Sequence, residues 1–149
     1  MLITKLDLNN KKVLVRVDFN VPMDKNLTVT DNTRIKSSIK TILYVLKKGG
    51  ACILISHMGR PDGYEKNLSL KNIVGELENL LNKKITFVND CIGTKVKKAC
   101  QESKKGDILL LENLRFYAEE ESGEISFAKS LSKLADIYIN DAFSCSHRK

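Results

Sequence analysis

Short apolar runs alternate along the chain with longer segments in which apolar residues recur every three or four positions. The apolar runs are rich in the aliphatic and β-branched residues that favour strands, and they cover 12–17, 51–56, 85–88, 107–111 and 135–140. Because these runs are apolar nearly throughout, they predict the strands of a parallel sheet that is buried on both faces.

Helical spacing predicts the elements between these strands. Residues 32–48 place isoleucine and leucine on one face, after Asp31 and Asn32 as candidate caps and before Gly49 as a stop. The same spacing predicts further helices, which follow Ser69 as an N-cap and continue to Leu81, and which cover 92–102 and 124–134. Strands joined by helix-length crossovers predict a three-layer α/β/α, Rossmann-like domain with a mainly parallel sheet.

The length of 149 residues, with 42% of them hydrophobic, suits one domain, 1–149, with a sizeable core. The apolar runs are far shorter than the roughly 20 residues that cross a bilayer. The N-terminus also lacks the apolar core of a secretion signal. We therefore expect a cytoplasmic protein with no membrane partner.

The spacing of the cysteine, histidine and acidic residues does not favour a metal site or a disulfide bond. Cys52, Cys91, Cys100 and Cys145 match neither a zinc ribbon nor a CxxC redox pair, so we expect free thiols. The run that begins at Asp24 starts like a calcium loop but lacks the glycine and the terminal glutamate. The chain has only two histidines, and we expect no metal site.

The net charge of +7, from 25 basic and 18 acidic residues, suits either a polyanionic partner or a merely lysine-rich surface. A module that binds nucleic acid is one alternative. The lysines are scattered, however, and the five phenylalanines and four tyrosines show no stacking pattern, so we expect no nucleic acid partner.

Most of the arginines follow predicted strands, although the chain uses lysine elsewhere. Ligands of a parallel sheet bind beyond the carboxyl ends of its strands, and four of the five arginines and both histidines fall there, with Asp18 and Asn20 after the first strand. These basic residues are Arg34, His57, Arg60, Arg115, His147 and Arg148. Arginine meets phosphate or carboxylate with a planar fork of donors that lysine cannot copy. We therefore expect a small, multiply anionic ligand.

The segment SHMGRPDG (56–63) has two interpretations. It could be an ordinary surface turn, because glycine and proline mark turns in general. Its place at the mouth of a strand instead favours a ligand loop with donors from His57 and Arg60, although a structural role stays open for His57 and is favoured for Arg16. The sequence has neither GxxxxGK[ST] nor GxGxxG, so a nucleotide phosphate loop is unsupported.

Four motifs resemble the substrate-binding motifs of the phosphoglycerate kinase family. They occur in the family's order and are VRVDFNVP (15–22), SHMGRP (56–61), LLLENLRF (109–116) and NDAFSCSHR (140–148). The resemblance implies a glycolytic, ATP-binding phosphotransferase that moves the acyl phosphate of 1,3-bisphosphoglycerate to ADP and yields 3-phosphoglycerate. It also implies two α/β domains, with this chain as the phosphoglycerate-binding one and Mg-ATP or Mg-ADP held by the other.

The resemblance further implies roles for single residues. Asp18 and Asn20, with Phe19 between them, would meet the carboxylate and hydroxyl end of the substrate. Arg34 would reach the transferring phosphoryl group and is the implied catalytic residue. The remaining implied substrate-binding residues, whose basic members would grip the other phosphate and the carboxylate, are His57, Met58, Gly59, Arg60, Arg115 and Arg148.

Two departures from the family pattern bear on these expectations. Ser144, Cys145 and Ser146 stand where the family more often has Gly-Thr-Ala, and Lys149 stands where an Ala-His-rich continuation is usual. The first departure is a small-residue variation, whereas the second leads us to expect an incomplete N-terminal domain that is inactive alone. We also expect the full enzyme to be a monomer. By resemblance the sheet order is 3-4-2-1-5-6, which leaves 135–140 as an open edge prone to pairing with another chain. A non-catalytic, partner-binding protein is the alternative.

Overall fold

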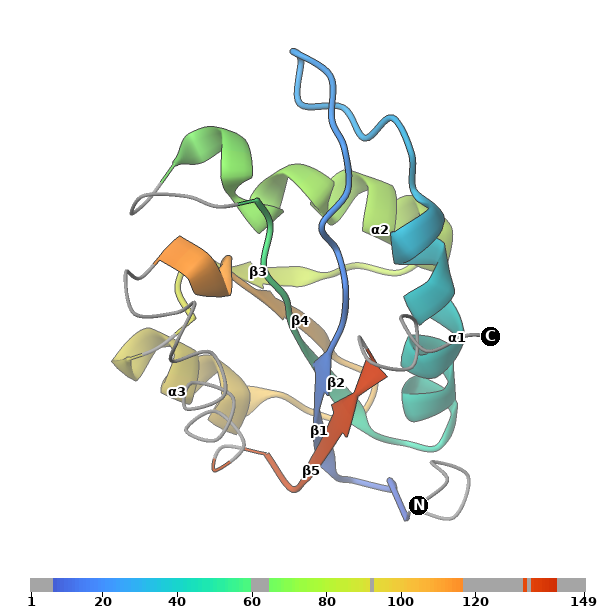
Figure 1. Cartoon of the computed structure of the whole chain (residues 1–149). Coiled ribbons are helices and arrows are strands. Elements are labelled where there is room, and N and C mark those ends of the chain that lie inside the picture. The colour runs from blue at the N-terminus through green and yellow to red at the C-terminus, as the bar shows by residue number, and fades with distance from the viewer. Residues whose placement is uncertain (1–6, 60–64, 92, 117–132, 134, 142–149) are drawn as a thin grey trace.

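The computed structural model describes residues 7–59, 65–91, 93–116, 133 and 135–141, and in them five strands form a single sheet (Figure 1). The strands are β1 (Lys12–Arg16), β2 (Ala51–Ile55), β3 (Thr86–Val88), β4 (Ile108–Leu111) and β5 (Ile137–Asn140). Their order is β3-β4-β2-β1-β5, and all pairings between them are parallel. The predicted parallel sheet and the order of its first five strands are therefore confirmed.

Helices cover both faces of the sheet, so the predicted three-layer architecture is confirmed as well. Helices α1 (Thr33–Lys47) and α2 (Val74–Leu81) lie on one side of the sheet, and α3 (Thr94–Glu102) lies on the other (Figure 1). Three short 3₁₀ turns follow the carboxyl ends of β2 and β4, namely η2 (Lys66–Leu68), η3 (Leu70–Ile73) and η4 (Leu114–Phe116).

Strand β2 shows how the layers pack together. All of its residues are buried, and successive side chains of a strand point to opposite faces of the sheet. Cys52 and Leu54 join the core beneath α1 and α2, whereas Ile53 and Ile55 join the core beneath α3. The uninterrupted apolar run in the sequence is thus explained, because neither face of this strand meets water.

Helix α1 uses only one of its two candidate caps. Oδ1 of Asp31 accepts hydrogen bonds from the Thr33 hydroxyl (2.6 Å) and the Thr33 backbone N–H (3.0 Å), and these bonds hold the pKa of the Asp31 carboxyl below its ordinary value. Nδ2 of Asn32 instead donates to Oε2 of Glu76 at 2.6 Å, which ties α1 to α2. At the other end Gly49, with a φ of +90°, stops the helix as predicted.

The predicted helix after Ser69 is divided in two. Ser69 caps it as expected, because its Oγ accepts a hydrogen bond from the Lys71 N–H at 3.1 Å. The first turn, however, is the 3₁₀ segment η3, and the α-helical part begins only at Val74. The third predicted helix starts at Thr94 rather than at residue 92. The helix predicted over 124–134 lies outside the described residues, apart from Lys133.

Three of the cysteines, Cys52, Cys91 and Cys100, are buried free thiols as predicted, and Cys145 lies outside the described residues. Burial raises the pKa of the Cys52 and Cys100 thiols, and the Asp141 carboxyl adds to the rise at Cys52. Both thiols therefore stay protonated at neutral pH. In the part of the chain that the structure describes, no helix is long and apolar enough to cross a membrane.

Candidate functional site

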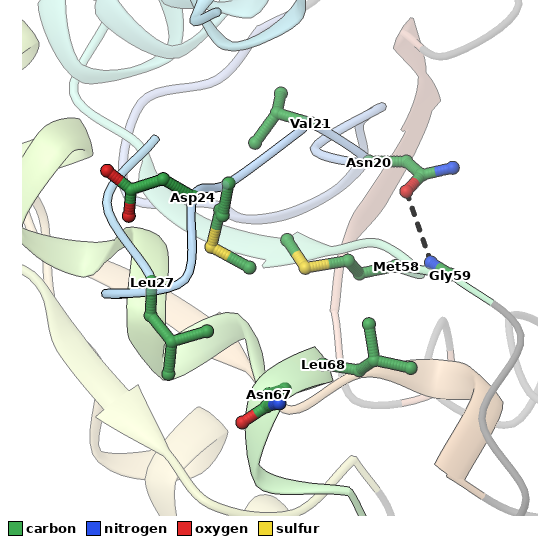
Figure 2. Close-up of a pocket in the computed structure, with 9 residues that line it drawn as sticks. Asn20, Val21, Asp24, Leu27, Met58, Gly59, Asn67 and Leu68 are labelled. Atoms are coloured by element: carbon green, nitrogen blue, oxygen red, sulfur yellow. Dashed lines mark hydrogen bonds between the residues drawn. The ribbon is translucent and has the colours of Figure 1, made fainter. Parts of the chain in front are cut away.

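Loops follow the carboxyl ends of β1, β2 and β4, and hydrogen bonds join them. In the loop after β1, Oδ1 of Asp18 accepts a hydrogen bond from the Asn20 N–H at 3.1 Å, which closes a short turn. Oδ1 of Asn20 in turn accepts a hydrogen bond from the Gly59 N–H at 3.1 Å (Figure 2). The side chain of Asn20 therefore holds the loops after β1 and β2 together.

Arg34 lies in the first turn of α1 and reaches back to the loop after β1. Its Nη1 donates to the Asn20 carbonyl oxygen at 2.8 Å and lies 3.7 Å from Oδ1 of Asp18. The Arg34 side chain is still 55% exposed, so protein groups orient the guanidinium while leaving it open to a ligand. The structure thus brings together three of the residues that the sequence singled out.

Two cavities flank the loop after β1, and Asn20 and Val21 line both of them. One cavity, of about 360 Å³, also has Asp31, Thr33 and Arg34 in its wall. The other, of about 280 Å³, is lined mainly by apolar side chains, which include Met23, Leu27, Met58 and Leu68 (Figure 2). The first cavity carries the Arg34 cation, so it is the better candidate for an anionic ligand.

The loop after β2 is packed closely against η2. Gly59 has a φ of +63°, a left-handed conformation that favours glycine. A Cβ atom at this position would lie 2.9 Å from Cδ2 of Leu68, so any larger residue would also displace the end of the Leu68 side chain. His57 is half-buried, and the Met58 side chain is buried where it meets the apolar cavity.

Phe19, the residue between Asp18 and Asn20, points its side chain into the core. Its side chain is completely buried in the core beneath α1 and α2, and its backbone N–H donates to Oγ of Ser56 at 3.0 Å. Val15, Val17 and Phe19 all join this core, so the alternation of β1 continues into the loop. The ring is therefore an anchor for the residues on either side of it, and it does not line either cavity.

The rest of the predicted basic cluster is not placed by the structure. Arg60, His147 and Arg148 lie outside the described residues. For Arg115 the structure describes the backbone only, which lies in η4 after β4, at the same edge of the sheet. The gathering of four arginines at this edge therefore stays a prediction.

Two residues that the sequence analysis did not single out connect the loop after β4 to the rest. Glu112 and Asn113 directly follow β4 and are both buried. Their side chains form hydrogen bonds with Met58 and with residues 68–70. The available signal was a pair of polar residues directly after the apolar run 107–111, because polar groups in such a place need partners within the protein.

The Asp24 carboxylate binds backbone N–H groups of its own loop. Its Oδ1 accepts hydrogen bonds from the backbone N–H groups of Asn26 (2.9 Å) and Thr28 (3.0 Å), and Met23 pairs with Val29 across this hairpin. The residues that begin like a calcium loop thus form a turn. Within the described ranges, no three His, Cys, Asp or Glu side chains gather closely enough to hold a metal ion.

Known proteins resemble this chain over nearly its whole length. The family model of phosphoglycerate kinase matches residues 3–149. The phosphoglycerate kinase of Wolbachia pipientis wMel is 55% identical over 146 residues, which are 98% of this chain and 36% of that protein. The cytosolic phosphoglycerate kinase of Nicotiana tabacum is 50% identical over 142 residues, which are 95% of this chain and 35% of that protein. The chain therefore spans about a third of the length of these curated relatives.

Two solved structures share the fold. The crystal structure of phosphoglycerate kinase from Pyrococcus horikoshii OT3 gives a TM-score of 0.83 at 32% identity, over 98% of this chain and 37% of that one. The structure of phosphoglycerate kinase from Coxiella burnetii gives a TM-score of 0.81 at 34% identity, over 98% of this chain and 36% of that one.

Proposed function

This chain belongs to the phosphoglycerate kinase family, and we propose that it is the phosphoglycerate-binding, N-terminal part of an enzyme that transfers a phosphoryl group between 1,3-bisphosphoglycerate and ADP. The products are 3-phosphoglycerate and ATP. The observation that carries the proposal is Arg34, held beside Asp18 and Asn20 in the wall of a cavity of about 360 Å³. An oriented but exposed cation suits a small anionic substrate.

In this proposal the loop after β1 binds the carboxylate and hydroxyl end of the substrate. Asp18 is an acceptor when ionised, which suits a hydroxyl group. Oδ1 of Asn20 is engaged by the Gly59 N–H, so Asn20 offers its Nδ2 donor, which suits a carboxylate oxygen. The proposed binding set is completed by His57, Arg60, Arg115 and Arg148, with Met58 and Gly59 supporting the loop.

Arg34 is the proposed catalytic residue. In phosphoryl transfer the protein contributes mainly positioning and the stabilisation of charge on the moving group. The Asn20 carbonyl occupies one donor of Arg34, which leaves the rest of the guanidinium fork for oxygens of the phosphoryl group. A donor that is oriented before the substrate arrives needs little reorganisation during the reaction.

We assign Mg-ATP and Mg-ADP to a second domain outside residues 1–149. The support for this is the sequence, which has neither of the two glycine-rich motifs that commonly hold nucleotide phosphates. The bound Mg²⁺ ion would neutralise charge on those phosphates. We further propose that the enzyme is a cytoplasmic monomer, with neither a membrane nor a nucleic acid as its partner.

Calorimetric titration of the 149-residue chain with 3-phosphoglycerate tests the proposal. We expect weak binding that decreases strongly between low and moderate salt, because the Arg34 side chain is more than half exposed. Arg34→Gln should weaken binding about tenfold, since it removes charge-assisted hydrogen bonds. Lys47→Gln is the matched control, because Lys47 lies exposed in the last turn of the same helix. Binding that ignores salt, or tighter binding of an uncharged analogue, would contradict the proposal.

A further inference from the structure

Asn113 is a fully buried residue whose side chain binds the backbone of distant loops. Its Oδ1 accepts a hydrogen bond from the Met58 N–H at 3.1 Å. Its Nδ2 donates to the carbonyl oxygens of Met58 at 2.8 Å and Leu68 at 2.9 Å. The amide thus engages both backbone groups of Met58, as a neighbouring strand would. With 0% of the residue exposed, bulk water does not compete for these bonds.

Glu112 fixes the position from which Asn113 acts. Its Oε1 accepts hydrogen bonds from the backbone N–H groups of Asn113 at 2.8 Å and Leu70 at 2.9 Å, and its Oε2 accepts one from the Ser69 hydroxyl at 2.6 Å. The backbone N–H of Glu112 donates to the Asp90 carbonyl at 3.1 Å. The amide of Asn113 is therefore attached to a rigid base at the end of β4.

The contacts of Asn113 continue into the candidate site. Met58 is followed by Gly59, whose N–H donates to Oδ1 of Asn20 at 3.1 Å, and the Asn20 carbonyl accepts from Nη1 of Arg34 at 2.8 Å. Gly59 also lies directly against Leu68, whose carbonyl Asn113 holds. A shift of Met58 or Leu68 would therefore displace the Gly59 N–H, and with it the side chain of Asn20.

We propose that Asn113 is a positioning residue, which sets the conformation of Met58 and Gly59 and thereby orients the Asn20 amide toward the ligand. The identity of that ligand rests on the proposed function, whereas the order of the loop does not. Binding the N–H and carbonyl of Met58 and the carbonyl of Leu68 needs a short planar group with one acceptor and two donors, which asparagine provides. An aspartate has the same shape but no donor for the Met58 and Leu68 carbonyls. A serine has only one hydrogen-bond donor for these two carbonyls.

Ser103 provides a matched control for the loss of a buried hydrogen bond. It is 7% exposed, and its Oγ donates to the Cys100 carbonyl at 2.7 Å. It directly follows α3 and precedes β4, so it lies toward the amino ends of the strands, away from the candidate site. Ser103→Ala and the Asn113 variants should both lower stability, but only the Asn113 variants should alter the site.

The experiment uses the 149-residue chain and its Asn113→Asp, Asn113→Ser and Ser103→Ala variants. Calorimetry measures the affinity for 3-phosphoglycerate, urea denaturation measures global stability, and NMR measures amide hydrogen exchange of Met58 and Gly59 without ligand. We expect both Asn113 variants to bind about tenfold more weakly, from the loss of preorganised donors, and to exchange these two amides faster than global stability accounts for. Ser103→Ala should bind within twofold of the unaltered chain. If Asn113→Asp does not fold, Asn113→Ser decides.

Unaltered exchange of Met58 and Gly59 in the Asn113 variants would overturn the inference. An equal loss of affinity in Ser103→Ala would also overturn the inference, if the variants are compared at the same free energy of unfolding. Asn113 would then act only through general stability. If the unaltered chain does not bind 3-phosphoglycerate, the proposed function fails instead, and the exchange rates of the two amides still decide the role of Asn113.

Discussion

At the scale of single residues, Arg34 combines anchoring with exposure. Its Nη1 is bound to a carbonyl oxygen at 2.8 Å, yet more than half of the side chain is exposed. A free arginine on the surface loses rotamer freedom when it binds an anion, so anchoring it beforehand lowers the entropic cost of binding. This advantage depends on the planar, forked shape of the guanidinium and not on its charge alone.

Arg34→Lys should therefore lower kcat by on the order of 10²-fold in a complete enzyme, made by joining this chain to the remaining residues of the Wolbachia pipientis wMel relative. Lysine keeps the charge but loses the fork, so only the geometry is changed. Arg60→Lys, at the implied site of the phosphate that does not move, should mainly raise KM. Steady-state kinetics with varied 3-phosphoglycerate separates the two effects. A change in KM alone for Arg34→Lys would refute its catalytic role.

Gly59→Ala should lower the free energy of unfolding by about 1–2 kcal/mol, mainly because it places an alanine in a left-handed conformation. Gly75→Ala is the matched control, since the methyl group it adds to α2 meets no atom within 4 Å apart from its chain neighbours and the backbone of its own helix. It should raise stability by up to about 1 kcal/mol. Urea denaturation measures both. Equal stability of the two variants would show that the Gly59 backbone relaxes freely.

At the scale of elements, a single hydroxyl group joins the start of η3 to the end of β4. Oγ of Ser69 accepts from the Lys71 N–H at 3.1 Å and donates to Oε2 of Glu112 at 2.6 Å. The Leu70 N–H donates to Oε1 of the same carboxylate. The orphan donors at this helix start are thus satisfied partly by its own cap and partly by a residue from the neighbouring loop.

Ser69→Ala should lower the free energy of unfolding by about 2 kcal/mol, since it removes both a cap and a buried bond to a carboxylate. Thr30→Ala removes a hydroxyl whose bond, to the Pro22 carbonyl at 3.3 Å, is exposed, and it should change stability by less than about 0.5 kcal/mol. Thermal and urea denaturation test the pair. If both variants lose the same amount, the link from η3 to β4 contributes nothing beyond an ordinary surface bond.

The elements with a local signal could be predicted from the sequence, and those that depend on distant partners could not. The apolar runs 12–17, 51–56 and 107–111 predicted β1, β2 and β4 because most residues of these three strands are buried. Asn32 was a plausible cap, but its side chain donates a hydrogen bond to Glu76 in another helix instead. Asn113 bonds to a residue 55 positions away, and no pattern within a few residues of it carries that information. The motif did not reveal that the Phe19 ring lies in the core, because a motif names residues without saying which way each side chain points.

At the scale of the whole molecule, one edge strand of the sheet is only partly buried. Strand β5 lies at one edge, and β1 is its single neighbour among the described strands. Its side chains are at most partly buried, and Tyr138 is 40% exposed. The edge strand of a sheet is the place where a strand of another chain can pair.

We therefore expect the apparent mass of the 149-residue chain to rise with its concentration in analytical ultracentrifugation. Tyr138→Lys should reduce this association, because a charge on an edge strand opposes pairing. Leu43→Lys is the matched control, since Leu43 is a comparably exposed apolar residue, at 39%, but lies on α1. Association that is lost with Leu43→Lys instead would move the contact to the helical face, and a strictly monomeric chain would refute the prediction.

The place of β1 in the sheet has a consequence for how the protein is made. β1 lies between β2 and β5, and its Lys12 N–H bonds to the carboxylate of Asp136, a residue 124 positions later. On the ribosome, β1 can pair with β2 as soon as that strand emerges. The opposite edge of β1 stays unpaired until β5 is synthesised, roughly ten seconds later at the usual pace of synthesis. A translational pause between β2 and β5 would lengthen the interval in which β1 can pair with a wrong strand.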